Sequence, residues 1–270
     1  MIAAYKESSE NYMEQTSEIV IDAKDRILGL HKGLGIIESF DENNPKMTIA
    51  DAARLNDLTR SAVRRHLLTL TELGYVETDG KYYWLSTKVL NFANAYLTSS
   101  RLPRVLTPFL QRITMNIGET AQASVLEKNE VVYIAKNSPP KIINAGWAVG
   151  RRMNPFLVTP GLVMLANIPE DKFKKLLDQY KPQPFTPFTM VNKKDIEKFI
   201  IDIRTKGYGI TSQQYELGVI GAAVPLRDRK GQLLGAISVT APTSRTTPDQ
   251  MREAAVPALL DCAQIIREII

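Results

Sequence analysis

The chain has few of the residues on which most enzyme chemistry depends. Its 270 residues include one cysteine, Cys262, and two histidines, His31 and His66. A single cysteine cannot form an intrachain disulfide, which fits a reducing, cytoplasmic location. Because both histidines precede residue 70, the rest of the chain cannot supply a Ser-His-Asp or Cys-His arrangement, or a His/Cys cluster for zinc or iron.

Long apolar runs are also missing. No stretch approaches the roughly 18 to 20 apolar residues of a membrane span, and the first ten residues do not have the pattern of a signal peptide. Gly207-Tyr208-Gly209 stands alone before a predicted strand, unlike a phosphate-binding glycine motif. A pair of carboxylates acting as general acid and base stays open, but nothing in the sequence points to one. We therefore expect no catalytic activity, cofactor or metal ion, and a core position for Cys262.

Acidic residues are unevenly distributed. The net charge is +5, and the stretches 80–118 and 131–169 contain no Asp or Glu between their end residues. Residues 25–85, in contrast, hold eight Lys or Arg against nine Asp or Glu. A mild positive balance hints at an anionic partner, but for residues 25–85 the placement of individual side chains matters more than their total charge.

Residues 25–85 have the pattern of a winged helix-turn-helix. A first helix is predicted from Arg26 to Phe40, with Ile27, Leu30, Leu34, Ile37 and Phe40 on one face. Thr48 and Asp51 resemble a capping box at the start of a short helix, and Thr59 is a good N-cap for a helix over 60–73 that stops at Gly74. Val63, Leu67, Leu70 and Leu73 form the apolar stripe of that helix. Two strand-like runs, 75–78 and 81–85, then flank an Asp79-Gly80 turn, a strong hairpin signal.

A second helix that begins with basic and hydroxyl side chains is typical of a recognition helix. Its N-terminal amides favour phosphate oxygens, and Arg can pair with guanine or phosphate. The alternative is a small packed domain whose Arg side chains are merely solvated. The order of capped helix, turn, capped helix and hairpin favours DNA binding, with these candidate contacts: Thr48, Thr59, Arg60, Ser61, Arg64, Arg65 and Lys81.

The C-terminal part alternates strand pairs with helices. Strands are predicted near 121–126, 131–135, 142–148, 209–213, 222–227 and 233–240, and helices near 160–166, 170–180, 195–206 and 248–270. Thr247, Pro248 and Gln250 would open the last helix with an N-cap, a first-turn proline and a capping glutamine. Such a pattern predicts an α+β class with an antiparallel sheet. With no catalytic constellation present, a ligand-binding domain is the better interpretation.

Several stretches resemble IclR-family transcription regulators. The most specific is LTRSAVRRHLLTLTELGYVETDGKYYWLSTKVLNFANAYL at 58–97, and the resemblance continues at 118–136, 149–166, 203–239 and 243–245. Within the family the chain is most similar to the branch that regulates aromatic-acid catabolism, such as the protocatechuate and p-hydroxybenzoate regulators.

The resemblance implies a domain order and an assembly. We expect a flexible tail at 1–24, a winged helix-turn-helix at 25–85, a linker helix at 86–102 and an effector-binding domain at 103–270. The linker would end before Pro103 and present Leu90, Ala93, Tyr96 and Leu97 on one apolar face. The family forms dimers or tetramers, and this branch contains activators more often than repressors.

The resemblance also implies a pocket for a small carboxylic acid. Its matching positions in this chain are Val158, Thr159, Pro160, Ser212, Val219, Ile220, Ser238 and Thr240. Hydroxyls and helix amides would hold the carboxylate or phenol of an aromatic acid, and apolar side chains would enclose its ring.

The chain departs from the family pattern at Asn154, Phe156 and Leu157, and at Ser212-Gln-Gln-Tyr-Glu216, where the family has an acidic run. Fewer acidic groups favour a carboxylate effector, whereas the bulkier Phe156 and Leu157 would change which ligand the pocket accepts. An aliphatic or keto-acid effector therefore stays open. A less favoured alternative is a metabolite-binding or enzymatic protein whose winged helix contacts another protein.

Overall fold

A computed structural model describes residues 22–140 and 145–270. The expected tail at 1–24 lies outside the described residues except for its last three positions. Contacts divide the chain into two compact units, the first ending at Tyr96 and the second running from Leu97 to Ile270. Within the described residues no helix combines the length and apolar character needed to cross a membrane.

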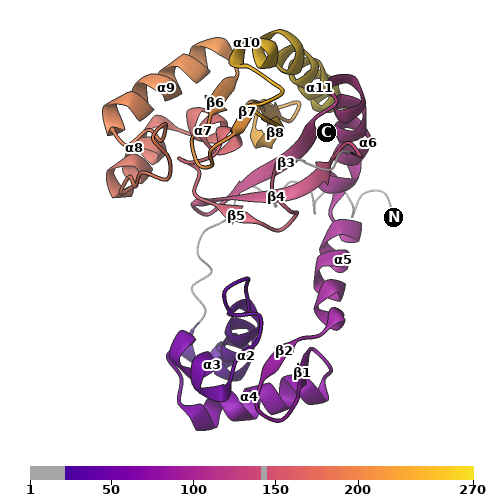
Figure 1. The fold of residues 1–270 in the computed structure, drawn as a ribbon, viewed down its shortest axis with the longest axis vertical. Coiled ribbons are helices and arrows are strands. Elements are labelled where there is room, and N and C mark those ends of the chain that lie inside the picture. The colour runs from indigo at the N-terminus through magenta and orange to yellow at the C-terminus, as the bar shows by residue number, and fades with distance from the viewer. Residues whose placement is uncertain (1–21, 141–144) are drawn as a thin grey trace. The chain divides into compact units, whose positions relative to one another are not determined.

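The first unit is a winged helix-turn-helix, as predicted. Its elements are η1 (Ala23–Asp25), α2 (Leu28–Glu38), α3 (Ile49–Leu55), α4 (Arg60–Glu72), β1 (Val76–Thr78) and β2 (Tyr83–Leu85) (Figure 1). Val63 and Leu67 of α4 are fully buried and pack with Ile36 of α2 and Ala52 of α3. Met47 forms an antiparallel bridge with Tyr83, so residues just before α3 extend the hairpin. This small apolar core fixes the orientation of α4 against α3.

The apolar face predicted for the first helix is correct for Ile37 and Phe40, which pack on the core of this unit, and wrong for its first three residues. Ile27, Leu30 and Leu34 are 70%, 59% and 44% exposed, and the buried residue of this helix is Ile36. Leu73 is also exposed rather than part of the α4 stripe, because α4 ends at Glu72 and Leu73 is its C-cap. Periodicity identified both helices, but it could not identify which apolar side chains the small core of this unit has room to enclose.

The hairpin loop is also longer than predicted. Thr78 pairs with Tyr83, so four residues, Asp79–Tyr82, connect the strands instead of a two-residue Asp-Gly turn. The Asp79 carboxylate accepts hydrogen bonds from the backbone N–H groups of Lys81 at 2.9 Å and Tyr82 at 2.8 Å. These bonds satisfy the loop backbone and make the longer connection stable.

The connection between the units is helical. It contains η2 (Thr87–Val89), α5 (Leu90–Ser99) and α6 (Arg101–Ile117), with an extended Ser100 between α5 and α6. No helix was predicted over 101–117, where Pro103 suggested a stop. Pro103 instead lies in the first turn of α6, where its missing N–H costs nothing, and Leu106, Leu110 and Ile113 are buried at helical spacing.

The second unit is built on an antiparallel sheet with strand order β5-β4-β3-β8-β7-β6. The strands are β3 (Thr120–Glu127), β4 (Glu130–Asn137), β5 (Arg152–Met153), β6 (Gly209–Ser212), β7 (Val219–Arg227) and β8 (Leu233–Pro242). The predicted α+β class with an antiparallel sheet is confirmed. The strand predicted at 142–148 is wrong at 145–148, and its residues 142–144 lie outside the described residues.

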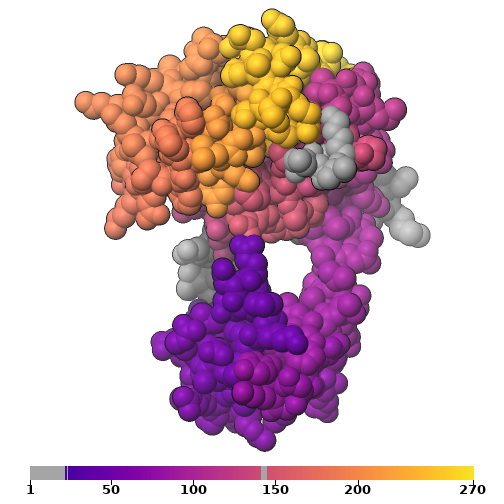
Figure 2. Space-filling model, in the orientation of Figure 1, coloured from indigo at the N-terminus to yellow at the C-terminus, as the bar shows by residue number. Residues whose placement is uncertain are grey.

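Helices cover both faces of this sheet. On one face, α6 and the C-terminal helix pack on Ala121, Ile220, Ala222 and Ile237. On the other face lie α7 (Thr159–Ala166), α8 (Glu170–Gln179) and α9 (Lys193–Lys206), with α7 against β7 and β8 (Figure 1). The orange atoms of α9 and the yellow atoms of the C-terminal helix form much of the surface of this unit in the space-filling view (Figure 2).

The predicted C-terminal helix is divided into α10 (Pro248–Gln250), a π-helical turn η3 (Met251–Ala255) and α11 (Val256–Ile269). The predicted cap is confirmed, since Thr247 and Gln250 form a capping box. Pro257 has no N–H to donate to the preceding turn, and the wider π turn directly before it accommodates that loss.

Candidate nucleic-acid interface and ligand-binding face

The helix-turn-helix is held by short polar contacts. The Thr48 hydroxyl donates to Asp51 Oδ2 at 2.7 Å, and the Asp51 N–H donates back to Thr48 Oγ1 at 3.3 Å, which confirms the predicted capping box. Asp57 in the turn adopts a left-handed φ of 49°. Thr59 then caps α4 by accepting from the N–H of Ala62. The start of α4 is therefore fixed relative to α3.

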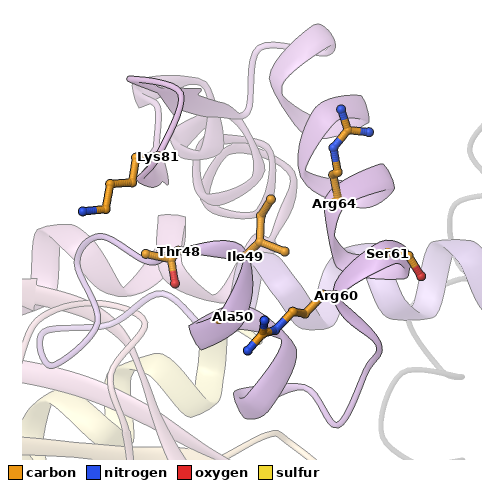
Figure 3. A pocket seen from close by; sticks show the side chains of 7 residues that line it. All are labelled: Thr48, Ile49, Ala50, Arg60, Ser61, Arg64 and Lys81. Atoms are coloured by element: carbon orange, nitrogen blue, oxygen red, sulfur yellow. The ribbon is translucent and has the colours of Figure 1, made fainter.

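The first turns of α3 and α4 and the hairpin loop enclose one concave surface of about 430 Å³. Its lining residues are Thr48, Ile49, Ala50, Arg60, Ser61, Arg64 and Lys81 (Figure 3). Arg60 and Arg64 are four residues apart and therefore lie on the same side of α4. Among the described residues neither forms an ion pair, so both guanidinium groups are available to an anion at this surface.

The hairpin loop brings a third cation to the concave surface. Lys81 is exposed, with its Nζ 5.0 Å from the centre of the Tyr82 ring. Hydrogen bonds from the Tyr82 and Lys81 N–H groups hold the pKa of Asp79 below its ordinary value, so the loop keeps an ionised carboxylate at its base. These hydrogen bonds hold the Asp79 carboxylate on its own loop backbone.

Five of the seven predicted DNA contacts line this surface, and Thr59 and Arg65 do not. Arg65 is one position beyond Arg64 and so points about 100° away around the helix. The hydroxyls of Thr48 and Thr59 already serve as helix caps. Ile49 and Ala50, at the first turn of α3, were not predicted. The capping box that marks the start of α3 could have located them.

In the second unit, the positions expected to bind a ligand do not all lie on one face of the sheet. Val158, Thr159 and Pro160 are buried at the start of α7, and the Thr159 hydroxyl is 2.6 Å from that of Thr211 on β6. Thr240 pairs with Gly221 of β7, and a Cβ at Gly221 would lie 2.7 Å from Thr159 Oγ1. This face is therefore the one that α7 covers.

Side chains alternate between the two faces of the sheet along each strand, and this divides the remaining predicted ligand-binding positions between the faces. Ser238 and Val219 lie two residues from Thr240 and Gly221 respectively, and so share the face covered by α7. Ile220 is fully buried among residues that pack on α6 and α11, and Ser212 is its register partner on β6. Ser212 and Ile220 therefore lie on the opposite face from Thr159.

Several polar residues on the α7 face were not predicted. Thr120, Gln122 and Ser124 alternate along β3 and are fully or almost fully buried, and Lys136 on β4 lies opposite Gln122. The run Thr-Ala-Gln-Ala-Ser at 120–124, with polar residues at every second position of a strand, was a signal that could have identified them.

Other titratable groups in the second unit have structural partners. Glu119 is buried and accepts two hydrogen bonds of 2.9 Å from Arg245, which raises the pKa of that guanidinium. Burial raises the pKa of the Cys262 thiol to about 11. A thiol with that pKa is protonated near neutral pH, as a core cysteine should be. Within the described residues no group of three or more His, Cys, Asp or Glu side chains could hold a metal ion.

Solved structures of other proteins share this fold. A transcriptional regulator from Rhodococcus sp. RHA1 superposes with a TM-score of 0.81 at 31% identity, over 90% of this chain and 98% of that chain. An IclR homologue from Microbacterium hydrocarbonoxydans, solved with 4-hydroxybenzoate, has a TM-score of 0.74 at 23% identity, over 89% of this chain and 98% of that chain.

Curated relatives match along nearly the whole length. The Pca operon regulatory protein of Acinetobacter baylyi is 31% identical over 94% of this chain and 93% of its own length. The p-hydroxybenzoate hydroxylase transcriptional activator of the same organism is 29% identical, over 93% and 94%. The IclR helix-turn-helix domain matches residues 29–80, and the C-terminal domain of the bacterial transcriptional regulator IclR matches 94–268. The chain therefore belongs to the IclR family of transcription regulators, which are DNA-binding proteins rather than enzymes.

Proposed function

We propose that the chain binds operator DNA with the concave surface between α3, α4 and the hairpin loop. The observation that carries this proposal is the convergence of Arg60, Arg64 and Lys81 on a surface where neither arginine has an acidic partner within the described residues. Arg60 and Arg64 on the first turns of α4 would read base edges in the major groove. Ser61 and Lys81 would bind phosphates. Thr48, which lines the surface, and Thr59 would act chiefly through the helix starts they cap, and Arg65 would act at the rim.

The second unit, in this proposal, senses an aromatic carboxylic acid, and the protein activates genes for its catabolism. Support comes from the two Acinetobacter relatives, one named for the pca operon and one for activation of p-hydroxybenzoate hydroxylase. The Microbacterium homologue with bound 4-hydroxybenzoate adds to it. The start of α7, with Val158, Thr159 and Pro160, and the adjacent Val219, Ser238 and Thr240 would surround the ligand. Ser212 and Ile220 would support this site from the opposite face of the sheet.

We also propose that the protein acts as a homodimer or tetramer on DNA in the cytoplasm. Ile27, Leu30 and Leu34 form an exposed apolar stripe on α2, and Leu90 and Phe92 of α5 are 63% and 54% exposed. Apolar area of this kind is suited to contact with a second copy. The functional division would follow the expected ranges, with DNA binding in 25–85, a linker in 86–102 and effector binding in 103–270.

A titration of labelled duplex DNA with the full chain tests the proposal. The duplex would be selected from a random library by the protein itself, and binding followed by fluorescence anisotropy from 50 to 200 mM salt, where a protein making several phosphate contacts loses roughly 10³-fold or more in affinity. We expect a steep salt dependence, two chains per site, and a changed affinity on addition of p-hydroxybenzoate or protocatechuate. A response only to glyoxylate or pyruvate would replace the aromatic effector with a keto acid. Failure to select any duplex would overturn the DNA-binding proposal.

A further inference from the structure

The face of the sheet that α7 covers has polar side chains at positions where a core is usually apolar. Thr120 and Gln122 are fully buried, and Ser124 is 1% exposed. The pairing of β3 with β8 is regular from Thr120 to Ser124, so these three alternate residues point to the same face. Buried polar groups destabilise a fold unless they have hydrogen-bond partners. Their partners therefore indicate what this face can bind.

Gln122 and Lys136 hold the same piece of backbone. They lie directly opposite each other on β3 and β4. The Gln122 amide donates from Nε2 to the carbonyl oxygen of Trp147 at 2.7 Å, and Lys136 donates from Nζ to the carbonyl oxygen of Gly146 at 3.4 Å. Two donors from neighbouring strands thus converge on two consecutive carbonyl groups. A carboxylate, with two acceptor oxygens on one carbon, can bind the same pair of donors.

Ser124 supplies a third group at a suitable spacing. Its Oγ is buried and has no hydrogen-bond partner in the described part of the chain. Ser124 lies two residues beyond Gln122 along β3, a rise of roughly 6.6 Å. This rise is close to the distance across a benzene ring between a carboxylate and a hydroxyl at opposite positions. An unpaired hydroxyl at that place has the chemistry to bind the far end of such a ligand.

Aromatic side chains flank the line from Gln122 to Ser124. Tyr133 of β4 is the register partner of Ser124 and is 3% exposed. Trp147, whose backbone Gln122 holds, packs edge to face on Tyr215 with ring centres 5.5 Å apart. Once Trp147 has moved, an aromatic ring lying between Gln122 and Ser124 would still have Tyr133 as an aromatic neighbour, which an aliphatic acid of the same charge would use less well.

We propose that an aromatic acid with its hydroxyl opposite its carboxylate binds along β3. Lys136 and Gln122 bind the carboxylate in place of the Gly146 and Trp147 carbonyls, and Ser124 Oγ bonds to the hydroxyl. This inference rests on the proposed effector function, and it adds the anchoring residues and the first step of the response. Binding frees residues 145–148 from the sheet, whereas Gly150 and Arg151 stay hydrogen-bonded to the backbone of Tyr133.

The exchange has a physical reason. A hydrogen bond from Lys136 to a neutral carbonyl at 3.4 Å is long, whereas an ammonium–carboxylate bond is shorter and roughly twice as strong. The ligand would thus replace one long bond, to Gly146, and one bond of ordinary length, to Trp147, with two charge-assisted bonds to itself. The exchange also breaks the 3.4 Å bond from the Trp147 N–H to Gln122 Oε1, a long bond that the charge-assisted bonds would have to offset.

Calorimetric titration of the full chain with p-hydroxybenzoate and with benzoate tests the three contacts. We expect Lys136→Met to weaken binding of both acids by roughly 10- to 100-fold, because a charge-assisted bond is lost. Lys136→Arg should recover much of that loss. Ser124→Ala should weaken p-hydroxybenzoate by roughly 5- to 10-fold and leave benzoate unchanged, because benzoate has no hydroxyl for Ser124 to bind. Lys175→Met, which removes an exposed lysine of α8, is the control for loss of charge.

Tryptophan fluorescence tests the movement of residues 145–148. The chain has two tryptophans, Trp84 and Trp147, so in a Trp84→Phe background Trp147 is the only one left. We expect its emission to change on addition of p-hydroxybenzoate, with the same half-saturation as in calorimetry. An unchanged emission at saturation would show that the segment stays on Gln122 and would overturn the exchange.

The outcomes separate this inference from the function on which it rests. If the wild-type chain binds none of the three acids p-hydroxybenzoate, benzoate and protocatechuate, the proposal of an aromatic effector is overturned, and the proposal of this site with it. If the wild-type chain binds these acids and the Lys136→Met and Ser124→Ala variants bind them equally well, only the placement along β3 fails. Thermal unfolding of each variant, compared with Lys175→Met, shows whether a loss of binding reflects a loss of fold.

Discussion

The two units of this chain place their functional polar groups in opposite environments. In the first unit, Arg60, Ser61 and Arg64 are exposed on α4, and the small core beneath them is apolar. In the second unit, Gln122 and Ser124 are buried within the sheet. DNA is a large ligand that meets the outside of a domain, whereas a small acid must be enclosed to be recognised. Substitutions of the exposed polar residues of the first unit should therefore weaken DNA binding without affecting folding. Substitutions of the buried polar residues of the second unit should affect both ligand binding and folding.

The largest difference between the units should be in the free energy of unfolding, when one glycine in each unit is replaced by alanine. A Cβ at Gly161 in α7 would lie against the backbone carbonyl of Pro155 and 2.5 Å from its Cα. Backbone atoms cannot move aside cheaply, so we expect Gly161→Ala to lower the free energy of unfolding of the second unit by about 2–3 kcal/mol. At Gly29 in α2 the same Cβ meets nothing within 4 Å, and Gly29→Ala should stabilise α2 by roughly 0.5–1 kcal/mol.

Urea unfolding of both variants, followed by the fluorescence of Trp147 and Trp84 in separate single-tryptophan backgrounds, measures the two units independently. The contrast fails if Gly161→Ala unfolds at the same urea concentration as the wild type. It also fails if Gly29→Ala is as damaging as Gly161→Ala.

The next effect concerns neighbouring arginines on one helix. Arg64 lines the concave surface, whereas Arg65 does not. We expect Arg64→Ala to weaken specific DNA binding by about 1–3 kcal/mol, while Arg65→Ala has a smaller effect spread over all sequences. Anisotropy titrations with the selected duplex and with an unrelated duplex measure both quantities, and neither variant should change the affinity for an aromatic acid. Equal losses for the two arginines would mean that α4 meets DNA with a different face.

The same contrast explains what could be predicted from the sequence. Capping residues, Gly74 and the hairpin pattern act locally, so the helix-turn-helix and the capping boxes at Thr48 and Thr247 were predicted correctly. The choice of sheet face depends on pairing between distant strands. Carrying over family positions therefore placed Ser212 and Ile220 with Thr159, although they lie on the other face.

Two further errors have the same origin. The helix over 101–117 was missed because Pro103 was taken as a stop, whereas its place in the first turn becomes evident only when Leu106 and Leu110 are seen to pack on the sheet. Gln122 was overlooked because a buried polar residue looks like any other strand residue until its partner, the backbone of Trp147, is known. Long-range contacts decide both cases.

The smallest effect is a dependence of the first unit on pH. Partial burial of His66 in α4 lowers its pKa below the ordinary value of 6.5, and the positive charges of Lys32 and Arg65 lower it further. As the pH falls below 6.5, the unfolded chain therefore takes up a proton that the folded chain does not. The stability of the first unit should decrease with falling pH in this range and level off below the pKa of the folded state. Urea unfolding followed by Trp84 fluorescence at pH 8 and pH 5.5 measures the change, which should disappear in His66→Gln. If His66→Gln keeps the full pH dependence, other groups cause it and the partly buried imidazole has no share in it.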